Sequence, residues 1–402
     1  MTSKEVAIIG AGLSGLALAL SLNQQNIPCT IYESRSASLD IGGAIMLSPN
    51  ALRILDTLGI YKTIKPLGYE FKRLHFYTDK PLDSYEFGDD EKYGYDALRI
   101  YRYELIDALL KAVHDREIPI HYGKKFIKIN FETETEVTWD FEDGTTGQAA
   151  CLVGADGIHS RVRKYLYPDL DPRFTNAVGV TAAVSRSQID QGSYDMPLTI
   201  MNPQRGAFVI APQLPDGSEA LIGKQKRVPE LDRQGWNDLM NNKEWCVDFL
   251  RDGAENFPQV VQSAVSDIPL NKINLWPFYV VPKLDTWASK NSRVVILGDA
   301  AHAIPPSAGQ GINQAFEDVY TYALVLSRCQ QQDLANGLKV WQHGRQGRVD
   351  RVLELNKQID ARRMPKEAKD VPSELDTKAF DLEWLYSPCF STMVDEWFQP
   401  AI

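Results

Sequence analysis

The sequence predicts an α/β fold in which a parallel-sheet domain is interrupted by an inserted mixed β-sheet and followed by a C-terminal helical region. Two distant stretches, Val6–Arg35 and Arg293–Leu326, each show a short apolar strand, a Gly-rich turn and a helix. Between them, residues 177–268 contain strand-like segments with turns of their own. One discontinuous domain explains this order better than two consecutive domains, because the crossover connections of a parallel sheet vary in length and accept an insertion.

The N-terminal stretch has the order of a strand–helix–strand unit. Val6–Ile9 is wholly apolar and mostly β-branched, as expected of a strand buried on both faces. An Ala- and Leu-rich helix is expected to run to about Gln24, and a second short strand, Cys29–Tyr32, comes after it. Val6–Leu22 is too short, and too rich in glycine and serine, for a membrane span. Neither a basic start nor a small-residue cleavage site marks it as a signal peptide.

Three glycines and one acid give this unit its predicted chemistry. Gly10 permits a tight turn, Gly12 lets a pyrophosphate approach the backbone, and Gly15 lets helix and strand pack closely. The helix N-terminus offers free N–H groups and the positive end of the helix dipole to phosphates. Glu33 follows the second strand, where its carboxylate can accept hydrogen bonds from a ribose. The stretch is therefore predicted to bind a dinucleotide.

Composition and charge exclude several classes of protein. The 402 residues are 44% hydrophobic and 24% charged, which is typical of a globular protein with a sizeable core. The net charge of −10 gives no electrostatic reason to expect nucleic acid or an anionic membrane as partner. Five scattered cysteines without a CxxC pair argue against a disulfide scaffold and against a metal site. A reducing, cytoplasmic location is expected.

The rest of the chain alternates between helical and strand-like segments. A capped amphipathic helix is expected from Ser48, and aromatic strands are expected over 70–86. Arg102 begins a strong amphipathic helix. A hairpin is expected at Asp143-Gly144, before a second buried strand that ends on Asp156.

The C-terminal part is expected to be mainly helical. A Trp-containing helix is predicted near Trp236–Leu250 and a long helical region over Ala335–Arg363. Aromatic residues of the tail are expected to cover the core: Trp384, Tyr386, Phe390, Trp397 and Phe398. The expected domains are residues 1–72, 99–176 and 270–350 for the nucleotide-binding part, 73–98 and 177–269 for the inserted substrate-binding sheet, and 351–402 for the C-terminal helix and tail.

Three motifs in order resemble those of one family. They are GAGLSG with Glu33 and Arg35, GADGIHSRVR at 154–163, and GDAAHAIPPSAGQG at 298–311. Together they resemble the class A, single-component flavoprotein monooxygenases of the salicylate and para-hydroxybenzoate hydroxylase type, with fungal enzymes looking closest. The resemblance implies an FAD-binding Rossmann-type (GR2-like) domain. A single GxGxxG agrees with this class and disagrees with Baeyer–Villiger enzymes, which carry two; the WxWxIP signature of flavin halogenases is missing.

The resemblance also implies which residues hold FAD. Glu33 would bind the adenosine ribose, Arg102 the pyrophosphate region, and Asp299 the ribityl chain or pyrophosphate. Backbone N–H groups of residues 309–313 would lie beside the isoalloxazine, where a helix N-terminus favours negative charge on the reduced flavin. The expected cofactor-binding residues are Gly10, Gly12, Gly15, Glu33, Arg35, Ala44, Arg102, Asp156, Asp299, Gly309, Gly311, Ile312 and Asn313.

The chemistry that the resemblance implies is hydroxylation. NADPH or NADH reduces FAD, O2 adds at C4a, and the flavin hydroperoxide transfers one oxygen atom to an aromatic or polyketide-like small molecule. An epoxidase or ring-modifying enzyme on the same scaffold stays open, as does a flavin-binding reductase or redox interaction module without oxygenase turnover. The protein could be a monomer or a homodimer.

Candidate catalytic residues are His75, Tyr279 and Pro306. His75 lies on an aromatic strand and could deprotonate a phenol. Tyr279 could reach the pocket, and Pro306 could shape the wall beside the flavin. Many salicylate hydroxylase-like enzymes carry a histidine where this chain has Tyr101, and an arginine in the strand that here is GVTAAVSRS, with Arg186 a few residues late. This difference argues against a carboxylate-bearing substrate.

Overall fold

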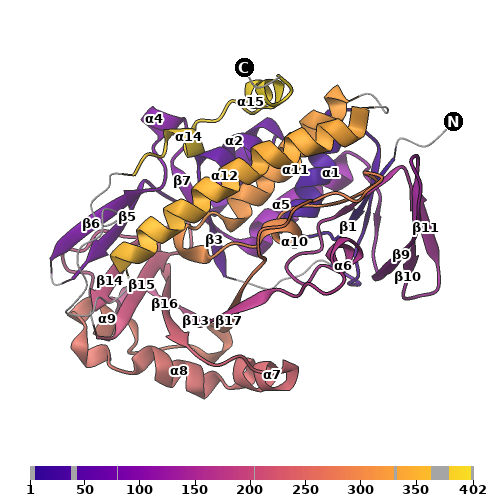
Figure 1. Cartoon of the computed structure of the whole chain (residues 1–402). Helices are drawn as coiled ribbons and strands as arrows, with labels where there is room; N and C mark the ends of the chain where they lie inside the picture. Colours follow the sequence, from indigo (N-terminus) through magenta and orange to yellow (C-terminus); the bar gives the residue numbers. More distant parts are fainter. Residues whose placement is uncertain are drawn as a thin grey trace.

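A computed structural model of the chain shows two sheet-based halves joined by a layer of helices (Figure 1). The structure describes residues 5–37, 43–78, 80–202, 204–329, 333–363 and 380–399. None of the helices in these ranges is both long and apolar enough to cross a membrane. The fold is the mixed α/β fold that the sequence predicts, with a parallel sheet, a separate mixed sheet and a helical C-terminus.

The parallel sheet has β1 (Val6–Ile9) at its centre. Its five strands run in the order β18-β12-β1-β2-β8, and all neighbours are parallel. The other four strands are β2 (Cys29–Tyr32), β8 (Ile120–His121), β12 (Cys151–Gly154) and β18 (Val294–Ile296). Strands from the first and third motifs thus lie in one sheet, which confirms that the two distant stretches form one unit. The predicted helix after the Gly-rich turn is α1 (Leu13–Gln24).

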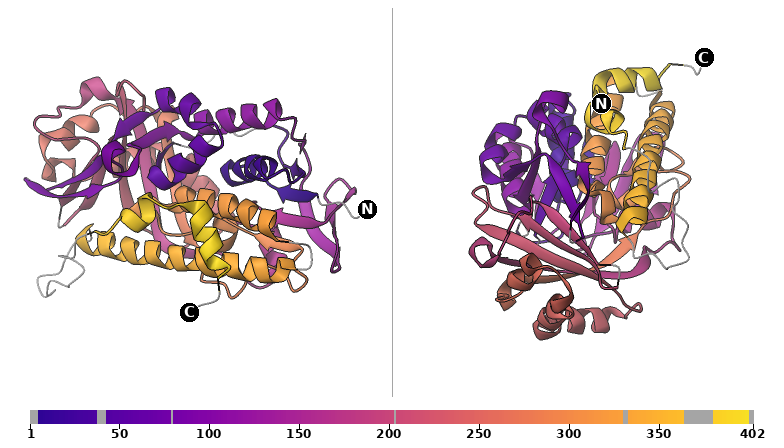
Figure 2. Two further views of the ribbon diagram at one scale, coloured as in Figure 1. Left: turned by 90° about the horizontal axis from the view of Figure 1, so that it is seen from above. Right: turned by 90° about the vertical axis from the view of Figure 1, so that its left-hand side faces the viewer.

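Helices cover this sheet and carry much of its core. Helix α1 packs between α5 (Arg102–Asp115) and α11 (Gly311–Arg328), as the view from above in Figure 2 shows. Leu105, Leu109 and Val113 of α5 are fully buried, which confirms the apolar stripe predicted for that helix. The other helices of this half are α2 (Pro49–Thr57), α3 (Tyr61–Ile64), α6 (Arg161–Leu166) and α10 (Asp299–His302). Helix α2 begins after Ser48 as expected, but the Ser48 hydroxyl donates to Asn50 Oδ1 instead of capping the helix.

The second large sheet has seven strands in the order β17-β13-β16-β15-β14-β5-β6. These are β5 (Arg73–Tyr77), β6 (Pro81–Glu86), β13 (Arg173–Ser185), β14 (Leu198–Asn202), β15 (Gly206–Pro212), β16 (Glu219–Arg227) and β17 (Ile273–Val280). Helices α7 (Arg233–Asn241), α8 (Lys243–Arg251) and α9 (Gln259–Ala264) pack on its outer face, at the bottom of Figure 1, and share its apolar core. The single helix predicted over Trp236–Leu250 is wrong, because Asn242 ends α7 and caps α8 with its side chain.

Sheet membership bears on the domain boundaries, which stay a prediction. Strand β5 pairs with β14 and β6 pairs with β5, so two segments far apart in the chain build one sheet, as the discontinuous boundaries expect. Strand β17 belongs to the same sheet, which favours moving the end of the inserted part from residue 269 to Val280. Residues from 173 onward already lie in β13, which favours starting the insertion a few residues before 177.

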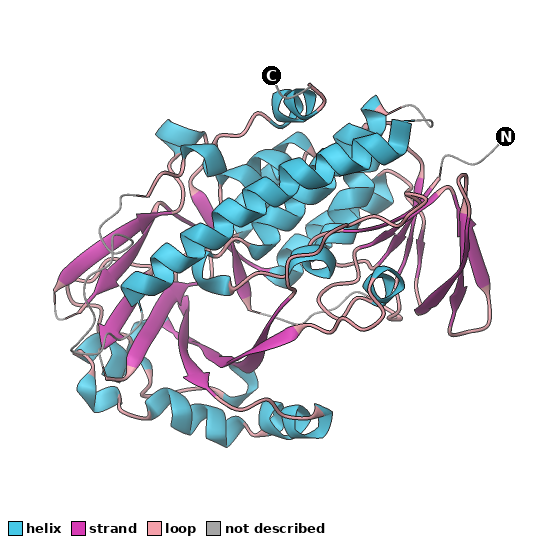
Figure 3. Ribbon diagram, viewed as in Figure 1, coloured by secondary structure: helices cyan, strands magenta, loops and turns pink. Residues whose placement is uncertain are grey.

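Two small sheets complete the fold (Figure 3). The first has the order β3-β7-β4 and joins β3 (Ala44–Leu47), β7 (Ala97–Tyr101) and β4 (Tyr69–Phe71), with the short helix α4 (Asp90–Tyr93) before β7. The second consists of β9 (Phe126–Glu132), β10 (Val137–Phe141) and β11 (Thr146–Ala149). The hairpin predicted at Asp143-Gly144 connects β10 and β11.

The C-terminal helices lie across the nucleotide-binding half. Helix α12 (Leu334–Arg363) runs along α11 over the length of the molecule, and α14 (Glu383–Tyr386) and α15 (Phe390–Trp397) follow it (Figure 1). Tyr386 and Phe390 are buried, whereas Trp384, Trp397 and Phe398 are half-buried. The aromatic tail therefore packs against the core, as predicted; the part of the predicted tail over 364–379 and 400–402 lies outside the described residues.

Candidate active site

A cavity of about 390 Å³ lies at the carboxyl end of β1. It brings together five segments of the chain: the Gly-rich turn, the end of β2, the start of α5, residues 122–126 after β8, and the loop after β12. Of the residues predicted to bind the cofactor, it is lined by Gly10, Gly12, Glu33, Arg35, Arg102 and Asp156. The carboxyl ends of parallel strands at a change of strand order are where such sheets bind ligands.

The geometry of the three glycines fits the three predicted roles. Gly10 has a φ of +108°, and a Cβ atom on it would lie 2.6 Å from the carbonyl oxygen of Ala155. A Cβ atom on Gly15 would lie only 1.9 Å from the carbonyl oxygen of Gly10, so helix and turn pack too closely for any side chain. A Cβ atom on Gly12 would meet no protein atom within 4 Å. Gly12 therefore borders open space in the cavity, where a phosphate group could approach the backbone.

Glu33 is fixed in place by backbone N–H groups. Its Oε2 atom accepts a hydrogen bond of 2.8 Å from the N–H of Ala11, and its Oε1 atom accepts one of 2.9 Å from the N–H of Arg35. The residue is 5% exposed, and it still borders the cavity. A carboxylate held in this way keeps lone pairs for a ligand hydroxyl without having to reorient.

Asp156 carries an acceptor atom that no protein group satisfies. Its Oδ2 atom accepts from the N–H groups of Arg161 (2.8 Å) and Val162 (3.2 Å). Its Oδ1 atom is buried and has no hydrogen-bond partner in the described part of the chain. Burial raises the pKa of Asp156, while the hydrogen bonds from Ser160, Val162 and Arg161 oppose that rise. An orphaned acceptor at the wall of a cavity is explained by a ligand donor, such as a nucleotide hydroxyl.

Asp299 begins α10, directly after Gly298, and does not line the 390 Å³ cavity itself. Gly298 adopts a φ of +57°, and its N–H donates to Asp318 Oδ2 over 2.8 Å. The surrounding protein desolvates Asp299 and raises its pKa, although the residue is exposed; the positive charges of His302 and Arg102 oppose the rise. The nearby Arg102 and the access to solvent both favour the ionised form of the carboxylate.

The N-terminus of α11 forms the next part of the site. Gly309 has a φ of +63°, and a Cβ atom there would lie 3.0 Å from Met46 and 3.1 Å from Phe87. A Cβ atom on Gly311 would meet nothing within 4 Å, so this turn also borders open space. The Asn313 side chain is buried and donates to the carbonyls of Met46 (3.1 Å) and Gly309 (2.8 Å). Asn313 therefore fixes β3 against the start of α11, and only its backbone remains available to a ligand.

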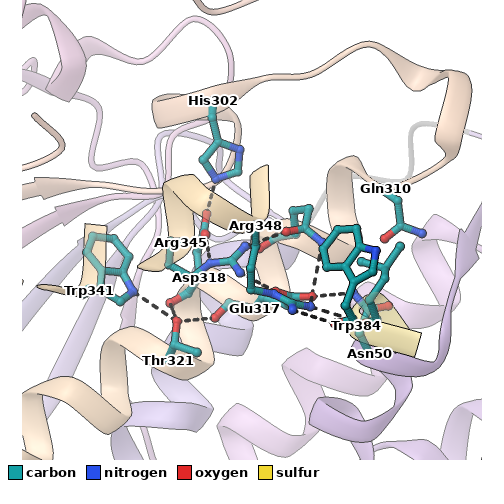
Figure 4. A network of polar contacts seen from close by, with 12 residues as sticks. Asn50, His302, Gln310, Glu317, Asp318, Thr321, Trp341, Arg345, Arg348 and Trp384 are labelled. Carbon is teal, nitrogen blue, oxygen red and sulfur yellow. Dashed lines mark hydrogen bonds and ion pairs between the residues drawn. The ribbon is translucent and has the colours of Figure 1, made fainter. Parts of the chain in front are cut away.

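A buried ionic network holds α11 in position, and none of the sequence motifs predicts it (Figure 4). Arg345 is fully buried, donates to Asp318 Oδ1 over 2.7 Å and pairs with Glu317. Arg348 donates to both carboxylate oxygens of Glu317 and to the carbonyl of Trp384. His302 Nε2 lies 2.5 Å from Asp318 Oδ2, which is the atom that also binds Gly298. The network therefore links α10, α11, α12 and the aromatic tail. Two arginines one helical turn apart, opposite an adjacent Glu-Asp pair in a buried helix, could have indicated it.

A second hollow, of about 520 Å³, lies between β7 and the strands β13 and β16. Its polar lining residues include Tyr101, Gln213, Glu219 and Lys272, and its apolar ones include Ala182, Ala183 and Leu221. Tyr101 lines this hollow and the next residue, Arg102, lines the first one. The N–H of Ala44, which pairs with Tyr101 across β3 and β7, donates to Gln213 Oε1 over 3.4 Å. The predicted residue Ala44 therefore lies directly after Gly43, which lines the second hollow.

The three predicted catalytic residues do not meet in one place. His75 lines a third hollow with Asp195 and Arg186, and burial lowers the pKa of His75. Tyr279 packs against Phe174 and His159, with ring centroids 5.3 Å and 5.8 Å away. Pro306 is exposed in the loop between α10 and α11. Their catalytic roles stay predictions, and the placement of His75 does not favour its role as a base in the second hollow.

Together, the parallel sheet, the Gly-rich turn at the head of α1, the fixed Glu33 and the orphaned Asp156 acceptor define a dinucleotide-binding protein of the Rossmann type. A sequence profile described as "FAD binding domain" matches residues 3–355, so the chain belongs to that family of flavoproteins.

Two relatives and one solved structure resemble the chain over most of its length. It is 28% identical over 354 residues to hispidin-3-hydroxylase of Neonothopanus nambi, covering 81% of each protein. It is 27% identical over 362 residues to 6-hydroxynicotinate 3-monooxygenase of Bordetella bronchiseptica, covering 87% of this chain and 90% of that one. The crystal structure of Klebsiella pneumoniae HpxO complexed with FAD and uric acid superposes with a TM-score of 0.76 at 22% identity, over 98% of this chain and 96% of that one. The predicted class is confirmed: the chain is an FAD-dependent, NAD(P)H-consuming monooxygenase.

Replacing Asp299 by Ala is expected to weaken FAD binding. The change removes a charged hydrogen-bond acceptor beside Arg102, and such bonds contribute about 1.5–3 kcal/mol, or roughly ten- to a hundredfold in the dissociation constant. The measurement is FAD titration of deflavinated protein, followed by flavin fluorescence. Asp169→Ala, an exposed aspartate on a turn, serves as the control. Full FAD affinity in the Asp299 variant would remove this residue from the cofactor site.

Proposed function

We propose that this monooxygenase hydroxylates an aromatic small molecule bound in the 520 Å³ hollow, with FAD running from the 390 Å³ cavity to that hollow. One observation carries the proposal: consecutive residues, Tyr101 and Arg102, open on the two spaces at the junction of β7 and α5. A cofactor with its nucleotide end in the first space can therefore present its other end to the second. The volume of the hollow lies in the range used by small-molecule sites.

Several of the predicted cofactor-binding residues support this path. Gly10, Gly12 and Glu33 border the nucleotide end, and Arg102, Asp156 and Asp299 provide charge and hydrogen bonds near the middle. The turn at Gly309–Gly311 and the N–H of Ala44 lie where β3 meets α11. The helix N-terminus favours negative charge there. Bound FAD supplies the redox chemistry, because it accepts a hydride from NAD(P)H and activates O2.

The second hollow has an apolar wall in addition to its polar side chains. Ala182, Ala183 and Leu221 give it an apolar wall on β13 and β16, and Tyr101 and Tyr103 face it from the other side. Apolar groups beside a polar site lower the local dielectric and so strengthen the electrostatic interactions of the polar side chains next to them. The names of two relatives, hispidin-3-hydroxylase and 6-hydroxynicotinate 3-monooxygenase, support an aromatic substrate.

A reducing location such as the cytoplasm remains part of the proposal. All five cysteines are free thiols in the structure, and Cys29, Cys151 and Cys246 are buried. Burial raises the pKa of Cys29 to about 12, with Glu5 adding to the effect, so this thiol is a poor nucleophile. Free buried thiols agree with a compartment that keeps cysteines reduced. Both a monomer and a homodimer remain compatible with the sequence.

The proposed function predicts a substrate-stimulated oxidation that yields a product with one added oxygen atom. Purified protein should be yellow, with flavin absorbance near ~450 nm, and phenolic compounds should accelerate its NAD(P)H consumption. The product should be about 16 mass units heavier than the substrate, and NMR of the product separates a hydroxyl group from an epoxide. NAD(P)H consumption with no oxygenated product from any aromatic compound would instead indicate a reductase.

A further inference from the structure

Four polar side chains in the second hollow form a connected set. Tyr101 donates a hydrogen bond from its hydroxyl group to Glu219 Oε1, and Lys272 donates to Glu219 Oε2. The Gln213 amide donates to the Tyr101 oxygen over 2.9 Å. Gln213 and Glu219 are 2% and 9% exposed, whereas Lys272 reaches solvent. Burial and the neighbouring Glu219 raise the pKa of Tyr101, so its phenol stays protonated and continues to donate to the carboxylate.

The charges of this set cancel at the wall of the hollow. Among the lining residues that the structure describes, Lys272 is the cation and Glu219 the anion, and the two are paired. Arg99 lies behind the wall, is 5% exposed and bonds Gln213 Oε1 over 3.4 Å. Arg186 lines the separate hollow that contains His75. A substrate carboxylate in the second hollow would therefore find no unpaired cation on its wall and would lie beside Glu219.

We propose that the second hollow selects uncharged phenols over carboxylate-bearing aromatics. Glu219 determines this selectivity because it pairs with Lys272, which then cannot bind a substrate carboxylate. The inference rests on the proposed function, because it assigns the substrate to this hollow. A phenol hydroxyl can donate to a remaining lone pair of the Glu219 carboxylate, and its oxygen can accept from a remaining N–H of Lys272.

The selectivity can be inverted without changing the shape of the hollow. Glu219→Gln is isosteric, keeps a hydrogen-bond acceptor for Tyr101 and releases the charge of Lys272. The test uses the holoenzyme and two matched pairs of probes, phenol with 4-hydroxybenzoate and resorcinol with 2,4-dihydroxybenzoate. Their dissociation constants are measured by calorimetry in the wild type, Glu219→Gln, the double variant Glu219→Gln/Lys272→Met, and Glu230→Gln, an exposed glutamate beyond the far end of β16.

The wild type is expected to bind each uncharged phenol at least about tenfold more tightly than its carboxylated partner. Glu219→Gln is expected to bind the carboxylated probes about tenfold or more tightly than the wild type does. The double variant is expected to lose that gain in affinity, and Glu230→Gln is expected to have the wild-type dissociation constants. Tighter binding of the carboxylated probes by the wild type overturns the inference even if the Glu219 variant fails to fold. An unchanged preference in Glu219→Gln, or no phenol binding at all, also overturns it.

Flavin content and the rate of flavin reduction by NAD(P)H, measured on the same samples, distinguish the two levels of failure. Protein that holds and reduces FAD but shows no effect of Glu219 on selectivity contradicts only the substrate inference. Protein that neither holds nor reduces FAD contradicts the proposed function as well.

Discussion

Replacement of Arg345 by Met is expected to lower the free energy of unfolding by about 3–5 kcal/mol, because it leaves buried carboxylates without their main partner. Arg345 is fully buried and bonds Asp318, Glu317 and both the carbonyl and the side-chain oxygen of Gln314. Methionine has a similar length but offers no donor. The measurement is urea unfolding of the holoenzyme, followed by circular dichroism at a fixed FAD concentration, since bound ligand adds to apparent stability.

The pH dependence of this variant supplies an independent readout. Burial alone raises the pKa values of Glu317 and Asp318, but Arg348 and Arg345 beside Glu317, and His302 and Arg345 beside Asp318, hold both below their usual values. Carboxyl groups with a lowered pKa stabilise the fold above their unfolded-state pKa of about 4, and that contribution is lost as the pH falls. Removal of Arg345 is expected to shift acid unfolding to higher pH.

Lys339→Met is the matched control, because Lys339 is exposed on the same helix. Lys339→Met is expected to change the free energy of unfolding by no more than about 0.5 kcal/mol. If Arg345→Met and Lys339→Met unfold at the same urea concentration, then the network in Figure 4 does not hold α12 on α11, and the position of the α10–α11 loop must depend on other contacts.

The nucleotide-binding half could be predicted because its signals are local. A turn that needs Gly10 at positive φ and Gly15 at a close contact leaves a pattern within ten residues. The strand before the turn and Glu33 after it also leave local patterns. A strand buried on both faces must be apolar, and a nucleotide site uses an acidic residue after the second strand. The same order of strand, Gly-rich turn and helix in a second, distant stretch predicts one discontinuous domain.

The substrate side could not be predicted in the same way, because its contacts join residues that are far apart in the chain. Tyr101 meets Glu219, 118 positions later, and Glu219 meets Lys272, 53 positions later. Neither pair has a periodic spacing that a sequence could reveal. The sequence favours His75 as a base because it lies on an aromatic strand, but strand β5 lies near the far edge of the seven-stranded sheet, away from β13 and β16. The position that a strand takes within a sheet depends on tertiary packing rather than on the residues of that strand.

Replacement of Gly12 by Val is expected to weaken FAD binding by more than a hundredfold, about 3 kcal/mol or more, while the protein stays folded. The Cβ position of Gly12 points into open space, and its backbone, with φ −77° and ψ −175°, is extended and suits any residue. The two added methyl groups would occupy the space in which a pyrophosphate approaches the N-terminus of α1. FAD titration of the deflavinated variant measures the loss, and circular dichroism with urea unfolding of the FAD-free protein measures the fold.

Two further valine substitutions show whether the effect belongs to the cavity. Gly15→Val places a Cβ atom 1.9 Å from the Gly10 carbonyl oxygen, so this variant is expected to lose the fold itself and not only the cofactor. Gly347→Val adds the same side chain on an exposed turn of α12, where a Cβ atom also meets nothing within 4 Å, and it is expected to bind FAD as the wild type does. An added Cβ atom meets no protein atom within 4 Å at either Gly12 or Gly347. Only a ligand over α1 can therefore make the two valine variants differ in FAD affinity. A Gly12 variant that binds FAD as tightly as the Gly347 variant would therefore place the nucleotide somewhere other than the 390 Å³ cavity.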